Sequence, residues 1–287
     1  MKLYVIGFGP GNKEGMTLEA ERALQESDLI VGYTVYVELL KEMFPCKEFA
    51  STAMKQEKDR VIFALEQADI GKIVSLVCSG DSSVYGMAGL ALELSANYPN
   101  TDIEIVAGVT AALSGGAVLG APLTHDFAVI SLSDLLTPWE KIEKRLACAA
   151  MGDFTTAIYN PSSKKRADYL AKACDITLKY KSPETVCGYV RNIGRIGMES
   201  GVMTLAELRD FKADMFTTVF IGNSETITAS LYESGATIAS VLANKFAEAE
   251  GLAKSSLFAL GLILLCITFA VVLGLISRKE NVVTKII

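Results

Sequence analysis

The chain has 287 residues, enough for a sizeable hydrophobic core and for two domains. Its formal net charge is −6 and no block of like charge occurs, which argues against nucleic-acid binding. It has six cysteines, none in a Cys-x-x-Cys pair, and a single histidine. We therefore expect no metal site and no disulfide framework, and reduced thiols indicate a cytoplasmic protein. The apolar run that opens the chain is too short for a secretory signal and is interpreted as a strand.

Strand-like and helix-like patterns alternate through the first 120 residues. The nearly continuous apolar run at 72–80 is typical of a strand that is buried on both faces. Thr17 can cap a helix that has Glu19 and Glu21 in its first turn. The expected strands are residues 2–9, 28–33, 72–80 and 103–109. The expected helices begin after Thr17 and otherwise cover residues 34–43, 84–96 and 110–120.

The same alternation starts again after residue 120, which predicts a second domain. The expected strands there are residues 127–133, 155–160, 184–190 and 215–222, and the expected helices are residues 138–150 and 163–178. Strands that alternate with helices predict α/β layering. The predicted fold is therefore α/β, with an N-terminal domain at 1–119 and a C-terminal domain at 120–226.

Beyond residue 226 the composition changes to an Ala- and Ser-rich segment with helical propensity. Residues 255–276 form a stretch of 22 residues without a charge, long enough to cross a bilayer as one helix. A buried soluble helix is the alternative. We expect 227–287 to be a helical tail whose transmembrane helix at 255–276 could tether the chain to a membrane. Arg278 and Lys279 favour a cytoplasmic C-terminal end.

Three glycine-bearing loops follow predicted strands, at residues 7–12, 79–86 and 108–116. In open α/β sheets, ligands bind beyond the carboxyl ends of the strands, so the three loops predict one shared site. Glycines let backbone groups approach a ligand closely, and Asp81 could accept a bond from a ribose hydroxyl or an amine. A plain tight turn is the alternative for the first loop. Because no GxxxxGK[ST] pattern occurs, we expect a nucleoside-like ligand and no nucleoside triphosphate.

The chain resembles the tetrapyrrole methylases over residues 1–226, most closely the members that methylate carbon 17 of precorrin-3B. The resemblance rests on five motifs in order: GFGPGN, SGDSSVYGMAGLALEL, GVTAALSGGAVLGAPLTHDFAVISLSDLLTPW, AIYNPSSKKR and TTVFIGNSET. It implies two α/β domains with the active site in the cleft between them, S-adenosylmethionine as methyl donor, and a homodimer. The implied substrate is precorrin-3B or cobalt-factor III, methylated at carbon 17 with contraction of the macrocycle.

The resemblance also implies which residues form the site. Those at the methyl donor would be Gly80, Asp81, Ser82, Val84, Tyr85, Gly108, Val109, Thr110, Tyr159, Asn160, Pro161, Thr217 and Thr218. Gly9 and Pro10 would lie on the substrate side of the cleft mouth. The alternatives, which involve no ligand, are a core position for Tyr85 and an ordinary turn at Asn160–Pro161.

The carboxylates of such a substrate require cationic side chains on the cleft wall. Arg191 is the main candidate, and the others are Arg195, Lys164, Lys165 and Arg166. Ring contraction needs a proton to be moved, which His125 could do near neutral pH. A structural hydrogen bond is the alternative role for His125.

The family's usual ending, a short strand and a Thr-Pro-Arg-Gly-Tyr segment, is missing. Residues 228–280 instead resemble the end of a phosphate ABC-transporter permease, so the chain has the character of a junction of two genes. Two alternatives to the C17-methyltransferase therefore stay open. One is another tetrapyrrole methylase of different carbon specificity, and the other is an inactive membrane-tethered fusion that binds only the donor.

Overall fold

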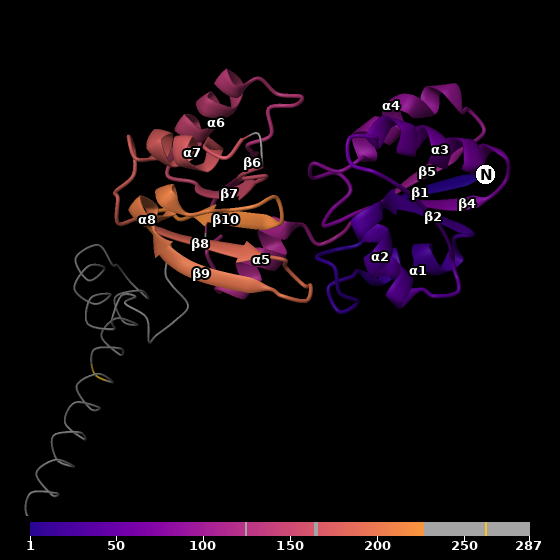
Figure 1. The fold of residues 1–287 in the computed structure, drawn as a ribbon, viewed down its shortest axis with the longest axis horizontal. Coiled ribbons are helices and arrows are strands. Elements are labelled where there is room, and N and C mark those ends of the chain that lie inside the picture. Colours follow the sequence, from indigo (N-terminus) through magenta and orange to yellow (C-terminus); the bar gives the residue numbers. More distant parts are fainter. Residues whose placement is uncertain (124, 164–165, 227–261, 263–287) are drawn as a thin grey trace, which may run out of the picture. The chain divides into compact units, whose positions relative to one another are not determined.

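The computed structural model describes residues 1–123, 125–163, 166–226 and Leu262. Residues Met1–Thr226 form one compact unit. This unit contains two five-stranded sheets with helices packed on their faces, as the alternation in the sequence predicts (Figure 1). Across the described residues, no helix is both long and apolar enough to span a membrane. Apart from Leu262, the expected tail at 227–287 and its helix at 255–276 lie outside the described residues.

The first sheet is entirely parallel, with the strand order β3-β2-β4-β1-β5. Its strands are β1 Lys2–Gly7, β2 Leu29–Tyr33, β3 Glu48–Thr52, β4 Ile73–Cys78 and β5 Asp102–Val106. Its helices are α1 Leu18–Glu26, α2 Thr34–Met43, α3 Glu57–Asp69 and α4 Ala88–Leu94, followed by the 3₁₀ turn η1 Ser95–Asn97.

Alternate residues of each strand of this sheet serve two separate cores. Leu3 and Val5 of β1 pack with α3 and α4, whereas Tyr4 and Ile6 pack with α1 and α2. The central strand β4 is buried on both faces, as its continuous apolar run predicts. The carboxyl ends of β1, β4 and β5 therefore lie side by side at one edge of the sheet.

The second sheet is mixed, with the order β6-β7-β10-β8-β9. Only β6 and β7 are parallel, and the remaining neighbours are antiparallel. Its strands are β6 Phe127–Ser131, β7 Thr155–Tyr159, β8 Val186–Arg191, β9 Glu199–Thr204 and β10 Thr217–Ile221. Its helices are α5 Ala111–Leu119, α6 Trp139–Met151, α7 Tyr169–Thr177 and α8 Leu205–Asp210.

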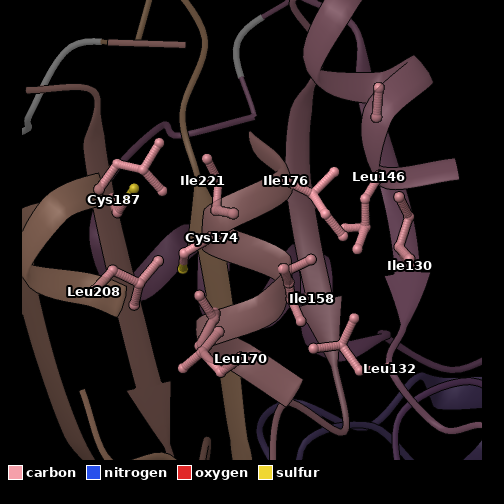
Figure 2. Close-up of a cluster of buried hydrophobic side chains, with 14 of the residues drawn as sticks. Ile130, Leu132, Leu146, Ile158, Leu170, Cys174, Ile176, Cys187, Leu208 and Ile221 are labelled. Carbon is pink, nitrogen blue, oxygen red and sulfur yellow. The ribbon is translucent and has the colours of Figure 1, made fainter. Parts of the chain in front are cut away.

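Helices cover the two faces of the second sheet unequally. The side chains of α6, α7 and α8 form the larger core with one face, where Leu170 and Cys174 lie among strand residues such as Ile158 and Ile221 (Figure 2). On the other face, Ala112 of α5 packs with Val190 and Phe220. The expected boundary between residues 119 and 120 assigns α5 to the first domain, whereas its packing on the second sheet favours a boundary before Ala111.

The expected elements are largely confirmed, and the differences have local causes. Thr17 caps α1 by accepting a bond from the Ala20 N–H at 3.1 Å. The helix expected from residue 84 begins only at Ala88, because the preceding residues form a loop around Asp81. Likewise, α7 begins at Tyr169 and not at 163. Four elements were not expected: β3, α3, β9 and α8.

Candidate functional site

The loops that follow β1, β4 and β5 pack directly against one another. Gly9 and Gly80 form an antiparallel bridge, with N–H···O distances of 3.0 and 2.7 Å. Both glycines have positive φ, +80° and +71°, which other residues adopt with difficulty. A Cβ atom on Gly108 would lie 2.2 Å from the Gly80 carbonyl oxygen and 2.3 Å from that of Gly7. The three glycine-bearing loops therefore converge at one point, as the sequence predicts.

The Asp81 carboxylate is the hydrogen-bond acceptor that joins two of these loops. Its Oδ1 atom accepts bonds from the Ser83 N–H (2.8 Å), the Ser83 hydroxyl (2.5 Å) and the Val84 N–H (3.1 Å). Its Oδ2 atom accepts a bond from the Gly108 N–H at 2.9 Å. Asp81 is buried and does not line the cavity, so its contacts in the structure serve the loops themselves.

The electrostatics of Asp81 follow from these bonds. Burial alone raises the pKa of its carboxyl, but the bonds from the Ser83 hydroxyl and from the N–H groups of Gly108, Ser83 and Val84 lower it. The net direction of the pKa is downward, so the side chain is a carboxylate at neutral pH.

A cavity opens beyond these loops and is lined by residues of both sheets. Its empty volume, including the open solvent at its mouth, is about 830 Å³. The site residues implied by the resemblance that line it are Pro10, Gly80, Val84, Tyr85, Thr110, Tyr159, Asn160, Thr217 and Thr218. Those that do not line it are Gly9, Asp81, Ser82, Gly108, Val109, Pro161, Arg191 and His125.

Several residues outside the cavity lining support those that form it. The Ser82 hydroxyl donates to the Val106 carbonyl oxygen at 3.2 Å and is fully buried. Gly9 and Gly108 make the backbone contacts that fix the loops, and Pro161, the residue after Asn160, is buried. These positions therefore shape the cavity without facing it.

Tyr159, at the end of β7 and in the cavity lining, links that strand to the start of α5. Its hydroxyl pairs with the Thr110 hydroxyl at 2.5 Å and accepts a bond from the Ala112 N–H at 2.6 Å. Burial raises the pKa of this phenol, and the bonds from Thr110 and Ala112 only partly offset that effect. Tyr159 is therefore a neutral hydrogen-bonding group at physiological pH.

We expect Tyr159→Phe to lower the free energy of unfolding by about 1–3 kcal/mol, because it leaves the buried Ala112 N–H without its acceptor. Urea unfolding followed by circular dichroism measures this change. Tyr180→Phe, at an exposed tyrosine that does not line the cavity, is the control and should change stability by less than about 0.5 kcal/mol. Equal effects of the two variants would contradict the linking role of Tyr159.

Tyr85 links the loop after β4 to β6 of the second sheet. Its hydroxyl donates to the Val129 carbonyl oxygen and accepts from the Ser131 N–H, both at 3.0 Å. The residue is 54% exposed and has a φ of 55°, so the alternative of a core position is wrong. Asn160 has a φ of 50° and donates to the Ser131 hydroxyl at 2.9 Å, which holds the end of β7 beside β6.

Two functional candidates from the sequence do not face the cavity. Arg191 pairs with Glu199, its register partner on β9, at 3.0 Å and with Asp214 at 3.2 Å. His125 is exposed and does not line the cavity. Substrate binding by Arg191 and acid–base catalysis by His125 remain predictions that their positions do not support.

The other cationic candidates can also be compared by whether they line the cavity. Lys164 and Lys165 lie outside the described residues. Arg166 pairs with Asp134 at 3.3 Å and donates to the Ser133 hydroxyl, and it does not line the cavity. Arg195, by contrast, does line it.

The sequence analysis missed part of the cavity wall. The missed residues are Tyr36, Ser79, Ala111, Ser114, Asn192, Ile193, Met215 and Phe216. Most of them adjoin predicted motifs: Ser79 precedes the glycine of its loop, and Ala111 and Ser114 follow Thr110 on α5. The signal for the 192–197 loop was its pair of glycines, Gly194 and Gly197, both with positive φ. Tyr36 on α2 carried no signal in the sequence.

Comparisons with known proteins agree with this architecture. Residues 2–209 match the family model of the Tetrapyrrole (Corrin/Porphyrin) Methylases. The chain is 44% identical over 230 residues to "Cobalt-factor III methyltransferase" of Priestia megaterium, an alignment that covers 78% of this chain and 43% of the relative. It is 43% identical over 225 residues to "Probable cobalt-factor III C(17)-methyltransferase" of Salmonella typhimurium, covering 78% of this chain and 93% of the relative.

A solved structure, that of the methyltransferase CobJ, superimposes with a TM-score of 0.71 at 38% sequence identity. The superposition covers 77% of this chain and 94% of that chain. The chain thus spans less than half the length of its Priestia megaterium relative but nearly the whole of the other two.

Proposed function

This chain belongs to the tetrapyrrole methylase family, and we propose from that premise that it is an S-adenosylmethionine-dependent methyltransferase of cobalamin biosynthesis. The proposed reaction is methylation of carbon 17 of cobalt-factor III, or of precorrin-3B, with contraction of the macrocycle. One observation carries the proposal: a cavity lined from both sheets opens where the loops after β1, β4 and β5 converge. Identities of 43–44% to relatives named for this reaction support the choice of substrate.

The residues that line the cavity fit the proposed donor. Ile193, Met215 and Phe216 offer apolar surface for an adenine ring, and the hydroxyls of Thr110 and Thr218 can bond to its ribose or amino acid portion. None of the described residues that line the cavity carries a carboxylate. We therefore propose that backbone carbonyl and hydroxyl oxygens face the sulfonium, and that Asp81 keeps their loops in place.

S-adenosylmethionine supplies an already activated methyl group, so the protein needs no nucleophile of its own for the transfer. Its contribution is proximity and alignment, which rigid elements provide best. The bridge between Gly9 and Gly80 and the carboxylate of Asp81 fix one wall of the cavity, and the neutral phenol of Tyr159 fixes the other.

Further parts of the proposal concern organisation. We propose that the two sheets correspond to domains at 1–119 and 120–226, apart from the placement of α5, and that the chain forms a homodimer. We also propose a cytoplasmic catalytic part, with a permease-like tail at 227–287 that tethers it to a membrane through 255–276. The uncharged run of 22 residues in the sequence supports the tether.

The test combines binding and turnover with the full chain. Calorimetry with S-adenosylhomocysteine measures occupancy of the donor site, and incubation with S-adenosylmethionine and cobalt-factor III or precorrin-3B measures methyl transfer. We expect one added methyl group, which NMR with a ¹³C-labelled donor assigns to carbon 17. Donor binding without turnover on either tetrapyrrole would favour the inactive fusion, and methylation at another carbon would favour a different specificity. Absence of donor binding would overturn the proposal.

A further inference from the structure

Arg195 reaches from one sheet's loops to those of the other. It lies in the connection between β8 and β9, and its Nε atom donates to the Pro10 carbonyl oxygen at 3.2 Å. Its Nη2 atom donates to the Ser79 hydroxyl at 2.8 Å. Pro10 follows β1 and Ser79 follows β4, so this one side chain touches two of the converging loops. All three residues line the cavity.

The guanidinium of Arg195 has aromatic rings beside it and no acidic partner. Its central carbon lies 5.5 Å from the ring centre of Tyr36 and 5.9 Å from that of Phe216, within the range of cation–π contacts. Among the described residues, no carboxylate forms an ion pair with Arg195, whereas Arg191 pairs with two and Arg209 with two. Among the described residues that line the cavity, Arg195 is also the only one with a charged side chain.

This arrangement differs from that of a second arginine without an acidic partner in the described part of the chain, Arg60. Arg60 is only 3% exposed, does not line the cavity, and donates to the Thr52 hydroxyl and the Ala53 carbonyl oxygen. Its bonds hold the segment that joins β3 to α3. Arg195 instead borders open space, where its charge is available to a ligand.

The surrounding backbone is shaped to accommodate the Arg195 side chain. Gly11 has a φ of +135°, and a Cβ atom there would lie 2.8 Å from Cγ and 2.9 Å from Nε of Arg195. Gly194 has a φ of +66°, and a Cβ atom there would lie 3.0 Å from Cβ of Pro10. The two loops thus interlock around the arginine, and glycines occupy the positions where a side chain would displace it.

We propose that Arg195 binds a carboxylate of the tetrapyrrole and orients the macrocycle in the cavity, an inference that rests on the proposed function. The Pro10 carbonyl and the Ser79 hydroxyl are neutral partners that leave the cation uncompensated. A substrate carboxylate can accept two parallel, charge-assisted bonds from the guanidinium, which are stronger than bonds to neutral acceptors. Because Arg195 already contacts the loops after β1 and β4, the bound carboxylate is held in a fixed relation to the donor loops.

The test compares Arg195→Gln, Arg195→Lys and the control Arg209→Gln in the full chain with cobalt-factor III. We expect Arg195→Gln to raise KM for the tetrapyrrole at least tenfold, with dissociation of S-adenosylhomocysteine changed less than about twofold. Arg195→Lys should recover part of the KM change, since it keeps the charge but not the paired geometry. Arg209→Gln, at an exposed arginine outside the cavity lining, should leave KM unchanged.

The outcomes separate the two proposals. Wild-type turnover together with an unchanged KM in Arg195→Gln would overturn the role of Arg195 and leave the proposed function intact. If S-adenosylhomocysteine binding weakens as much as KM rises, or weakens in both Arg195 variants while KM stays unchanged, Arg195 holds the loops together and does not bind the substrate. Either result would also overturn the inference. A wild-type chain that binds S-adenosylhomocysteine but neither binds nor methylates cobalt-factor III or precorrin-3B would overturn both proposals.

Discussion

Asp81→Asn is expected to lower the free energy of unfolding by about 2–4 kcal/mol and to weaken donor binding more than tenfold. The carboxylate accepts bonds from the N–H groups of Ser83, Val84 and Gly108, and from the Ser83 hydroxyl. An asparagine would present an NH₂ group to at least one of these donors, leaving part-buried N–H groups unpaired at about 1–3 kcal/mol each. Urea unfolding and calorimetry with S-adenosylhomocysteine measure the two effects.

The control for this prediction is Asp102→Asn, at an exposed aspartate that begins β5. It carries the same change of charge but does not lie in the loops, and we expect stability within about 0.5 kcal/mol of wild type. If the two variants unfolded at the same urea concentration, the Asp81 carboxylate would not be what joins the loops.

The bonds to Asp81 also predict a pH dependence. The pKa of Asp81 is lower in the folded protein than its ordinary value, because the hydrogen bonds outweigh the effect of burial. Its contribution to stability is therefore complete above the ordinary pKa of an aspartate, about 4, and is lost as pH falls through the lower folded-state value. Unfolding measured from neutral pH to acid should show a smaller stability loss below about pH 4 in Asp81→Asn than in wild type. If the free energy of unfolding fell equally with pH in both proteins, the pH dependence could not be assigned to Asp81.

Much of the site was predictable because glycine patterns report backbone geometry. A glycine is needed where two backbones meet closely, so the glycines at 7, 9, 80 and 108 carried the information that their loops pack together. The role of Asp81 was only partly predictable. Its position at a strand end indicated the site. Whether its carboxylate accepts hydrogen bonds from a ligand or from four groups of the protein depends on loop geometry that the sequence does not specify.

The arginines show where sequence reasoning ends. Arg191 and Arg195 lie four residues apart, yet β8 ends between them, which leaves Arg191 opposite Glu199 on a neighbouring strand and places Arg195 in the following loop. The sequence analysis favoured Arg191, although both arginines lie in the same motif. Only the strand's end and register decide which guanidinium is paired and which borders the cavity.

Strands and helices were predictable where the apolar pattern was strong, and the prediction missed them where the pattern was weak. The exposed edge strands β3 and β9 present little apolar pattern. The helix α8 could have been found from its capping box, in which Thr204 and Glu207 bond to each other's backbone N–H groups. The packing of α5 on the second sheet was not predictable, since its pattern fits either sheet.

Gly108→Ala is expected to be strongly destabilising. Its new methyl group would lie 2.2 Å from the Gly80 carbonyl oxygen and 2.3 Å from that of Gly7. Both neighbours are backbone atoms that are fixed by hydrogen bonds, so a rotamer change cannot relieve the overlap. We expect the free energy of unfolding to fall by about 3 kcal/mol or more, because overpacking against fixed backbone is costly.

The loops would also separate, and a displacement of about 1 Å in an aligned site can reduce activity on the order of a hundredfold. Gly89→Ala, on α4, is the matched control because a Cβ atom there meets nothing within 4 Å. Alanine favours helix over glycine, so this variant should be as stable as wild type or more stable by up to about 1 kcal/mol. Urea unfolding and methyl transfer measured on both variants test the contrast. A Gly108→Ala protein with wild-type stability and activity would mean that the loops can part without consequence, and the shared site at the strand ends would then lose its physical basis.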